Sequence, residues 1–240
     1  MWWLLIIVLL LLLLFFVRRR HSIHVVISRY NENVSWKDRL VYQSTVYEKN
    51  PVPGYRYNIP VNKGQEAPVY FKYILDNYYA LPDYIIFLHG HETSWHQNKS
   101  IVDTVNSLWF GNEYTNINDT KQKFKLKKDS RGFNITDYID NEQIDTYNIR
   151  EVMGDDMDKW WKETMEEYFG SFDDKVTTDT CCAQFVVSKN AILRHPLSFY
   201  EKHYNWLLET DIDNKYTSRF YEWTWKYIFT CNSQSKKPEL

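Results

Sequence analysis

Two histidines follow an apolar stretch of the chain, and their spacing suits the binding of a metal ion. Residues 84–88 read YIIFL, and His89, Gly90 and His91 come directly after them. At the end of an extended strand, side chains at positions i and i+2 point to the same face, about 7 Å apart. His89 and His91 can therefore hold one metal ion together or lie on either side of a diphosphate group.

The same segment allows a second chemistry, that of a metal-dependent hydrolase. Residues 91–96, HETSWH, are similar to the HExxH helix of zinc proteases but contain one residue too many. Two histidines at i and i+5 lie about 140° apart around a helix, so they cannot share one ion there. This alternative therefore needs a zinc site built from a loop, with His89, His91 and His96 as ligands.

Strands and one helix must position these residues. Apolar and β-branched runs predict strands at residues 24–28, 40–47 and 84–88, and helical spacing with a proline in the first turn predicts a helix over 66–79. This order indicates an α/β fold, in which ligands bind at the carboxyl ends of the strands. The expected site comprises Arg29 to Glu32, Glu48, and His89 to Glu92.

The middle of the chain separates charge of opposite sign. Residues 121–131 are basic and residues 151–174 are rich in acids, which predicts two solvated faces, or a basic flap over phosphate groups. Further on, we expect a strand at 183–188, a helix over 198–209 and a last aromatic helix over 219–229 that packs back on the sheet.

Length and charge limit the class of protein. With 240 residues, the chain is long enough for one α/β domain over residues 21–232, followed by a polar tail at 233–240. A net charge of −2 provides no basic field, so nucleic acid is not expected as a partner. The odd count of 3 cysteines forms no disulfide framework and favours a reducing compartment.

The N-terminus carries the strongest apolar run. Residues 2–17 are uninterrupted apolar sequence that spans roughly 24 Å as a helix, and three arginines follow. This pattern predicts a single transmembrane anchor in the lipid bilayer and lacks the features of a cleaved signal peptide. The positive-inside rule favours a cytosolic bulk, which we rank first. Four glycosylation sequons favour a lumenal bulk instead, at Asn33, Asn98, Asn118 and Asn134.

Three separated motifs resemble the family named domain of unknown function 3431 (DUF3431). They are VVISRYNENVSW, NKGQEAPVYFKYILDNYYALPDYIIFLHGH and CCAQFVVSKNAILRHPLSFYEKHYNWL. The resemblance covers most of residues 24–230 and implies membership of that family, without naming a reaction.

A weaker resemblance does suggest a reaction. In nucleotide-sugar glycosyltransferases of the A-type fold, notably family 2, a first strand ends in Tyr-Asn-Glu, an Asn-x-Gly segment begins a helix, and the next strand ends in Asp-x-Asp. Residues 30–32 and 62–64 are similar to the first two motifs, but His89-Gly90-His91 stands in place of the third. The resemblance implies a three-layer domain with a central mixed sheet and a membrane-anchored enzyme. Such an enzyme moves a sugar from a nucleotide-sugar donor to a hydroxyl of a glycan or glycoprotein, with Mn²⁺ or Mg²⁺ as possible cofactor.

The glycosyltransferase resemblance also implies roles for individual residues. The donor is expected to contact Arg29, Asn31, Glu32, Glu48, Asn62, Lys63, His89 and His91, of which His91 and His89 are the candidate metal ligands. A carboxylate must deprotonate the acceptor hydroxyl, and the candidates are Glu201 and then Asp156. Gln184 is expected to line the acceptor pocket. A non-catalytic, membrane-anchored module that binds glycans or a protein through its many aromatic residues remains a further alternative.

Overall fold

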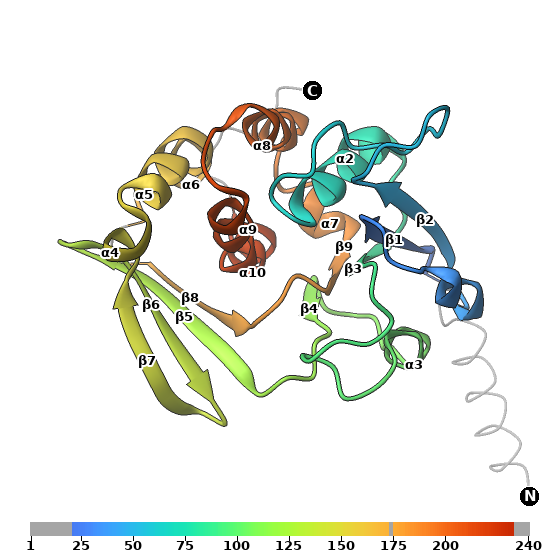
Figure 1. Ribbon diagram of the computed structural model, residues 1–240, viewed down its shortest axis with the longest axis horizontal. Helices are drawn as coiled ribbons and strands as arrows, with labels where there is room; N and C mark the ends of the chain where they lie inside the picture. The colour runs from blue at the N-terminus through green and yellow to red at the C-terminus, as the bar shows by residue number, and fades with distance from the viewer. Residues whose placement is uncertain (1–20, 173–174, 233–240) are drawn as a thin grey trace, which may run out of the picture.

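Two β-sheets and the helices around them make up the fold in this computed structural model (Figure 1). The structure describes residues 21–172 and 175–232. The larger sheet has the strand order β2 (Gln43–Glu48), β1 (Ile23–Arg29), β3 (Tyr84–His89), β9 (Phe185–Ser188) and β4 (Tyr114–Asn116). The strands β2, β1 and β3 are parallel, whereas β9 is antiparallel to both of its neighbours. The predicted α/β architecture with a mixed sheet is confirmed.

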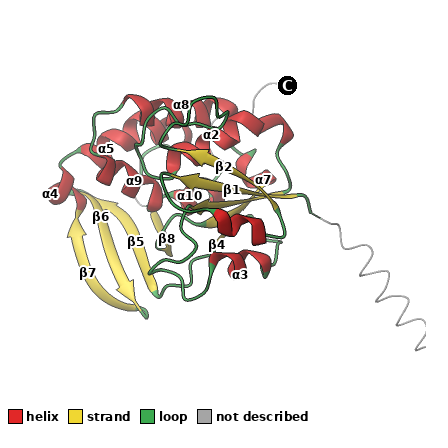
Figure 2. Cartoon of the chain, turned by 45° about the vertical axis from the view of Figure 1, so that its right-hand side comes forward, coloured by secondary structure: helices red, strands yellow, loops and turns green. Residues whose placement is uncertain are grey.

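Both faces of the larger sheet are covered, which explains why its inner strands are almost continuously apolar. On one face, Val25 and Ile27 pack with residues of the 3₁₀-helix η1 (Ser35–Arg39) and of α3 (Ile101–Asn106). On the other face, Val26 belongs to a larger cluster with α2 (Ala67–Asn77) and α8 (Leu197–Glu209). Figure 2 shows these helices above and below the strands.

The second sheet was not expected from the sequence. It is antiparallel, with the order β7 (Glu142–Asn148), β6 (Gly132–Ile139), β5 (Gln122–Asp129) and β8 (Val176–Thr180). Most of the basic run at 121–131 forms β5, because Phe124 and Leu126 are buried while the lysines that alternate with them remain at least partly accessible. Asp140 and Asn141, with φ of 52° and 68°, form the two-residue turn that joins β6 to β7.

The remaining helices are mostly short. They are η2 (Tyr78–Ala80), α4 (Ile149–Met153), α5 (Asp156–Trp160), the π-helix η3 (Trp161–Met165), α6 (Glu166–Phe169), α7 (Lys189–Ile192), α9 (Asn214–Glu222) and α10 (Trp225–Thr230). The single helix expected over 219–229 is therefore two helices. Thr224 has φ −122° and ψ −6°, outside the helical range, and this interrupts the helix between α9 and α10.

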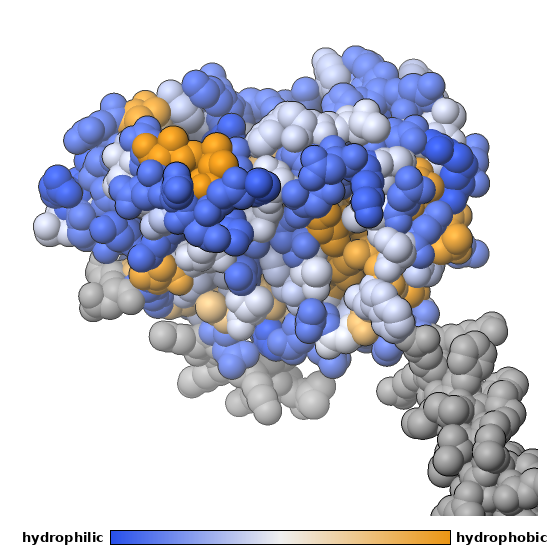
Figure 3. Space-filling view, turned by 90° about the horizontal axis from the view of Figure 1, so that it is seen from below, coloured by the Kyte–Doolittle hydropathy of each residue, from blue (hydrophilic) through white to orange (hydrophobic). Residues whose placement is uncertain are grey.

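Most of the large aromatic side chains lie in the core, including Trp160, Trp161 and Trp225. The face of the molecule in Figure 3 is mostly hydrophilic, with hydrophobic residues in separate patches. Exposed aromatic residues are present, of which Trp95 is 72% and Trp109 79% accessible. Scattered apolar residues of this kind are ordinary on a protein surface. The aromatic content of the chain is therefore explained largely by the core.

The predicted membrane anchor at residues 2–17, its basic flank and the polar tail at 233–240 lie outside the described residues. Within 21–172 and 175–232, no helix combines the length and apolar character that crossing a membrane requires. The anchor and its orientation stay predictions. Among the sequon asparagines, Asn118 and Asn134 are buried in the folded chain.

Candidate functional site

The carboxyl ends of the three parallel strands bring the polar loop residues to one edge of the sheet. Arg29 pairs with Glu48 in the β1–β2 register, and Ser28 pairs with His89 in the β1–β3 register. The guanidinium of Arg29 donates to Glu48 Oε1 at 2.7 Å and to the carbonyl of Glu32 at 2.7 Å. Arg29 therefore ties the loop after β1 to the end of β2.

The carboxylate of Glu32 is fixed against the loop after β3. It accepts hydrogen bonds from the backbone N–H groups of Tyr30 and Asn31. Burial alone would raise the pKa of Glu32, but these hydrogen bonds and the charge of Lys49 outweigh it, so the pKa lies below its ordinary value. A Cβ atom added to Gly90 would lie 2.8 Å from Glu32 Oε2, so only glycine allows this close approach.

His89 pairs with His96, a partner seven residues further along the chain. Their Nε2 atoms are 3.1 Å apart, and His96 Nδ1 lies 3.2 Å from the hydroxyl of Ser94. Burial and the neighbouring His96 lower the pKa of His89 to about 3. Both rings are neutral at pH 7, because burial also lowers the pKa of His96.

His91 has a different environment from His89. Its side chain is 61% exposed, and its Nε2 atom lies 3.6 Å from Glu32 Oε1. Its backbone N–H donates to His89 Nδ1 at 3.3 Å. The structure thus pairs the ring of His89 closely with that of His96, and it directs His91 toward the carboxylate of Glu32.

A cavity of about 490 Å³ opens beside the end of β3. Its walls come from segments far apart in the sequence: the loop after β3, the turn before α2, the loop before β9, and α9. The lining side chains with polar or charged groups include His89, His96, Glu66, Lys215, Arg219 and Glu222. The last three belong to α9, about 130 residues after β3.

Glu66 is the acidic residue of this cavity that precedes α2. Its side chain is 21% exposed, and its Oε1 atom is 3.9 Å from Nζ of the buried Lys49. Burial raises the pKa of Glu66, and the charge of Lys49 opposes that effect only in part. The sequence did not predict that Glu66 would line a cavity. Only its position two residues after Gly64 placed it near the expected site.

The segment Asn62-Lys63-Gly64 is fixed to the loop before α9. The Lys63 ammonium donates to the carbonyl of Thr210, and the backbone N–H of Gly64 donates to Asn214 Oδ1 at 2.6 Å. Gly64 has φ +69°, a value that favours glycine. Asn62 is exposed, and neither Asn62 nor Lys63 lines the cavity.

Other residues expected at the site lie elsewhere. Glu201 is exposed on α8, and Asp156 begins α5; neither lines the cavity. Gln184 is fully buried, and its Nε2 atom donates to Asn118 Oδ1 at 3.1 Å. Asn31 is exposed, and its side chain accepts a hydrogen bond from Asn50.

A second cavity of about 500 Å³ lies between α9 and the second sheet. It is lined by Asp137, Asp145 and Tyr147 of the sheet, and it shares Lys215, Arg219 and Glu222 with the first cavity. The side chains of α9 thus form a wall between the two cavities.

Comparison with known proteins identifies the family of the chain. No curated protein and no solved structure matches it. The model of the family described as "Protein of unknown function (DUF3431)" matches residues 25–239, which is most of the chain and includes every residue of both cavities. The chain therefore belongs to the DUF3431 family.

Proposed function

We propose that this protein is a glycosyltransferase that moves a sugar from a nucleotide-sugar donor to a hydroxyl of a glycan or glycoprotein. One observation carries the proposal: the cavity is lined by His89, at the carboxyl end of the parallel strand β3 in an α/β sheet. The other residues expected at this edge, Arg29, Glu32, Glu48 and His91, do not line it. Ligands of open α/β sheets bind at this edge. Its volume of about 490 Å³ is also in the range of small-molecule sites.

A donor with a diphosphate group needs positive charge that the cavity lining does not provide. Lys215 and Arg219 line the cavity together with the acids Glu66, Asp213 and Glu222, and Arg219 is paired with Glu222 at 2.6 Å. His89 cannot add a positive charge at pH 7, since its pKa is about 3. A neutral imidazole is, however, the form that binds a metal ion, and Mn²⁺ accepts nitrogen ligands more readily than Mg²⁺ does. We therefore assign the facing Nε2 atoms of His89 and His96 as the atoms that would hold Mn²⁺, provided that the His91 N–H releases His89 Nδ1 and the ring proton moves there. The ion would neutralise charge on the departing diphosphate.

Glu66 is the best candidate for the base that deprotonates the acceptor hydroxyl. It lines the cavity, and its raised pKa moves it toward the working pH, as general-base catalysis requires. Glu201 and Asp156, the candidates from the sequence, do not line this cavity. Glu66 is preferred to both because it lines the cavity.

The zinc-hydrolase alternative has less support. Among the residues that the structure describes, a single group of potential ligands has three atoms within 4.8 Å of one another, and it contains none of His89, His91 and His96. His91 is directed toward Glu32 instead. These three histidines therefore do not meet in the arrangement that a three-histidine zinc site needs.

A thermal-shift panel tests the proposal on the full-length chain. UDP-, GDP- and CMP-sugars are added with and without Mn²⁺. A ligand at about 100 times its Kd stabilises the folded state by about 2.7 kcal/mol, which raises Tm by roughly 5–10 °C for a chain of this size. We expect one class of nucleotide sugar to give this shift, with Mn²⁺ present, and to release free nucleotide when an acceptor is added.

Two histidine variants provide the control. His89→Ala should lose the donor-induced shift, whereas His21→Ala should keep it, because His21 contacts Tyr84 at the opposite end of β3. Absence of any shift across the panel, with folded protein, would remove the glycosyltransferase proposal. Stoichiometric zinc that is lost in the His89→Ala variant would favour the hydrolase alternative.

A further inference from the structure

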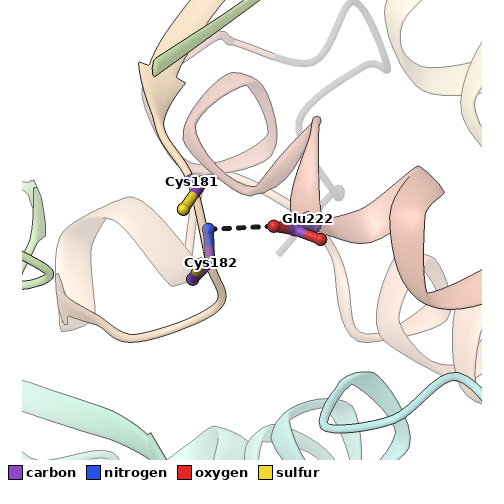
Figure 4. A group of neighbouring side chains, drawn as sticks. All are labelled: Cys181, Cys182 and Glu222. Atoms are coloured by element: carbon purple, nitrogen blue, oxygen red, sulfur yellow. Dashed lines mark hydrogen bonds between the residues drawn. The ribbon is translucent and has the colours of Figure 1, made fainter. Parts of the chain in front are cut away.

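Three side chains with metal-binding atoms, those of Cys181, Cys182 and Glu222, lie close together (Figure 4). The sulfur atoms of Cys181 and Cys182 and one carboxylate oxygen of Glu222 all lie within 4.8 Å of one another. Cys182 and Glu222 line the first cavity, and Cys181 and Glu222 line the second. The group is therefore accessible from solvent-filled space on both sides.

The backbone at Cys182 explains how two adjacent cysteines reach one point. In an extended chain, neighbouring side chains point to opposite faces. Cys182 instead has φ 78°, a left-handed conformation that is uncommon for a residue other than glycine. The turn places its backbone N–H 3.0 Å from Glu222 Oε1, so the chain is fixed with both sulfurs within 4.8 Å of the carboxylate.

The charge balance of the group also suits a divalent ion. Two thiolates and one carboxylate carry three negative charges, of which a divalent cation neutralises two. The guanidinium of Arg219 lies 2.6 Å from Glu222 Oε2 and neutralises the third. Arg219 thus balances the charge of the ligand set through Glu222 Oε2.

We propose that Cys181, Cys182 and Glu222 form a binding site for Zn²⁺. Thiolates are soft ligands and select zinc over Mg²⁺ or Ca²⁺. Three protein ligands leave the fourth tetrahedral position to water, and the adjoining cavities give that position room. The site does not depend on the proposed function, because it involves neither His89 nor Glu66.

A bound zinc ion would join three parts of the fold. The two cysteines lie in the loop between β8 and β9, so they connect the second sheet to the larger one. Glu222 is the last residue of α9, which carries Lys215 and Arg219. Zinc would hold this wall of both cavities in place, and stabilise the folded chain as it binds.

Co²⁺ provides a direct probe of the thiolate ligands. We expect the chelator-treated full-length chain to give a thiolate-to-cobalt charge-transfer band in the near ultraviolet that saturates at one equivalent of Co²⁺ in this site, and Zn²⁺ to abolish the band and raise Tm. Changes to groups that merely orient metal ligands weaken binding about 10–100-fold. Cys181→Ser and Cys182→Ser each remove a ligand, so they should reduce the band and weaken Zn²⁺ binding more than about 100-fold, and replacing both should abolish the band.

Cys231 is the matched control, because it is a free cysteine outside this group. Cys231→Ser should retain the band and the zinc affinity, and Glu222→Gln should weaken binding while circular dichroism stays unchanged. Folded wild-type chain that binds Co²⁺ without the charge-transfer band, or does not bind it, overturns the proposal before any variant is considered. A band that persists when Cys181 and Cys182 are both replaced overturns it equally.

Discussion

The Nε2 atoms of His89 and His96 lie 3.1 Å apart at the carboxyl end of the central strand of the larger sheet. The N–H of His91 donates to His89 Nδ1, so the proton of a neutral His89 ring is on Nε2 and is donated to His96. His96 then carries its proton on Nδ1, which faces Ser94. This chain of hydrogen bonds orients both rings at the edge of the cavity.

The pH dependence of stability should reflect the low pKa of His89. Its pKa is about 3 in the folded chain and 6.5 without the fold, so the unfolded state binds more protons between these values. The contribution of the neutral His89 ring to the free energy of unfolding is therefore fully present above about pH 6.5, and it is lost as the pH is lowered. Urea unfolding at pH 7 and pH 5 should show that His89→Gln reduces this loss by about 1–2 kcal/mol. His21→Gln is the control, and an equal loss in wild type and His89→Gln contradicts the assignment.

Gly90→Ala should disturb Glu32. The new Cβ would lie 2.8 Å from Glu32 Oε2, so the carboxylate must leave the N–H groups of Tyr30 and Asn31. We expect a loss of about 1–3 kcal/mol in the free energy of unfolding. In a Glu32→Ala background the same substitution should cost much less, and a double-mutant cycle measures this coupling. Additive effects of the two substitutions would show that the contact is unimportant.

Gly64→Ala and Gly54→Ala separate two costs of replacing a glycine. Both glycines have positive φ, +69° and +76°, but only a Cβ at Gly64 meets a neighbour, Leu207 Cδ2 at 2.5 Å. The left-handed conformation costs roughly 1–2 kcal/mol at either position. The contact with the buried Leu207 should add about 1–3 kcal/mol at Gly64. Denaturant unfolding checks this order, which equal losses at the two positions would contradict.

Glu66→Gln tests the assignment of the base. If Glu66 deprotonates the acceptor, kcat should fall about 10²–10⁴-fold while the donor-induced Tm shift is retained. Glu201→Gln should leave kcat unchanged, since Glu201 is exposed on α8 away from the cavity lining. The reverse pattern, with Glu201→Gln inactive and Glu66→Gln active, would restore the candidate that sequence position suggested.

The local sequence was sufficient for strands β1, β2, β3 and β9 of the larger sheet and for one edge of the candidate site, but not for the three-residue β4. Strands buried on both faces need continuous apolar residues, so β1 and β3 stand out at 23–29 and 84–89. The ends of adjacent parallel strands share one edge, so Arg29, Glu48 and His89 could be expected together. Strand β5 was harder to predict, because its lysines hide the alternation of Phe124 and Leu126.

The tertiary structure alone decided the other half of the site. The residue types at the end of β3 suggest that His89 and His91 act together. Only the folded loop shows that His89 contacts His96 and that His91 is directed toward Glu32. The contact of Gly64 with Asn214 joins positions 150 residues apart and brings α9 to the cavity. Periodicity and turn signals describe residues near one another in the chain, whereas such contacts depend on how whole elements pack. For that reason the sequence determined the main strands of the larger sheet and their polar ends. Packing determined the second sheet and which carboxylates, cations and cysteines line the cavities.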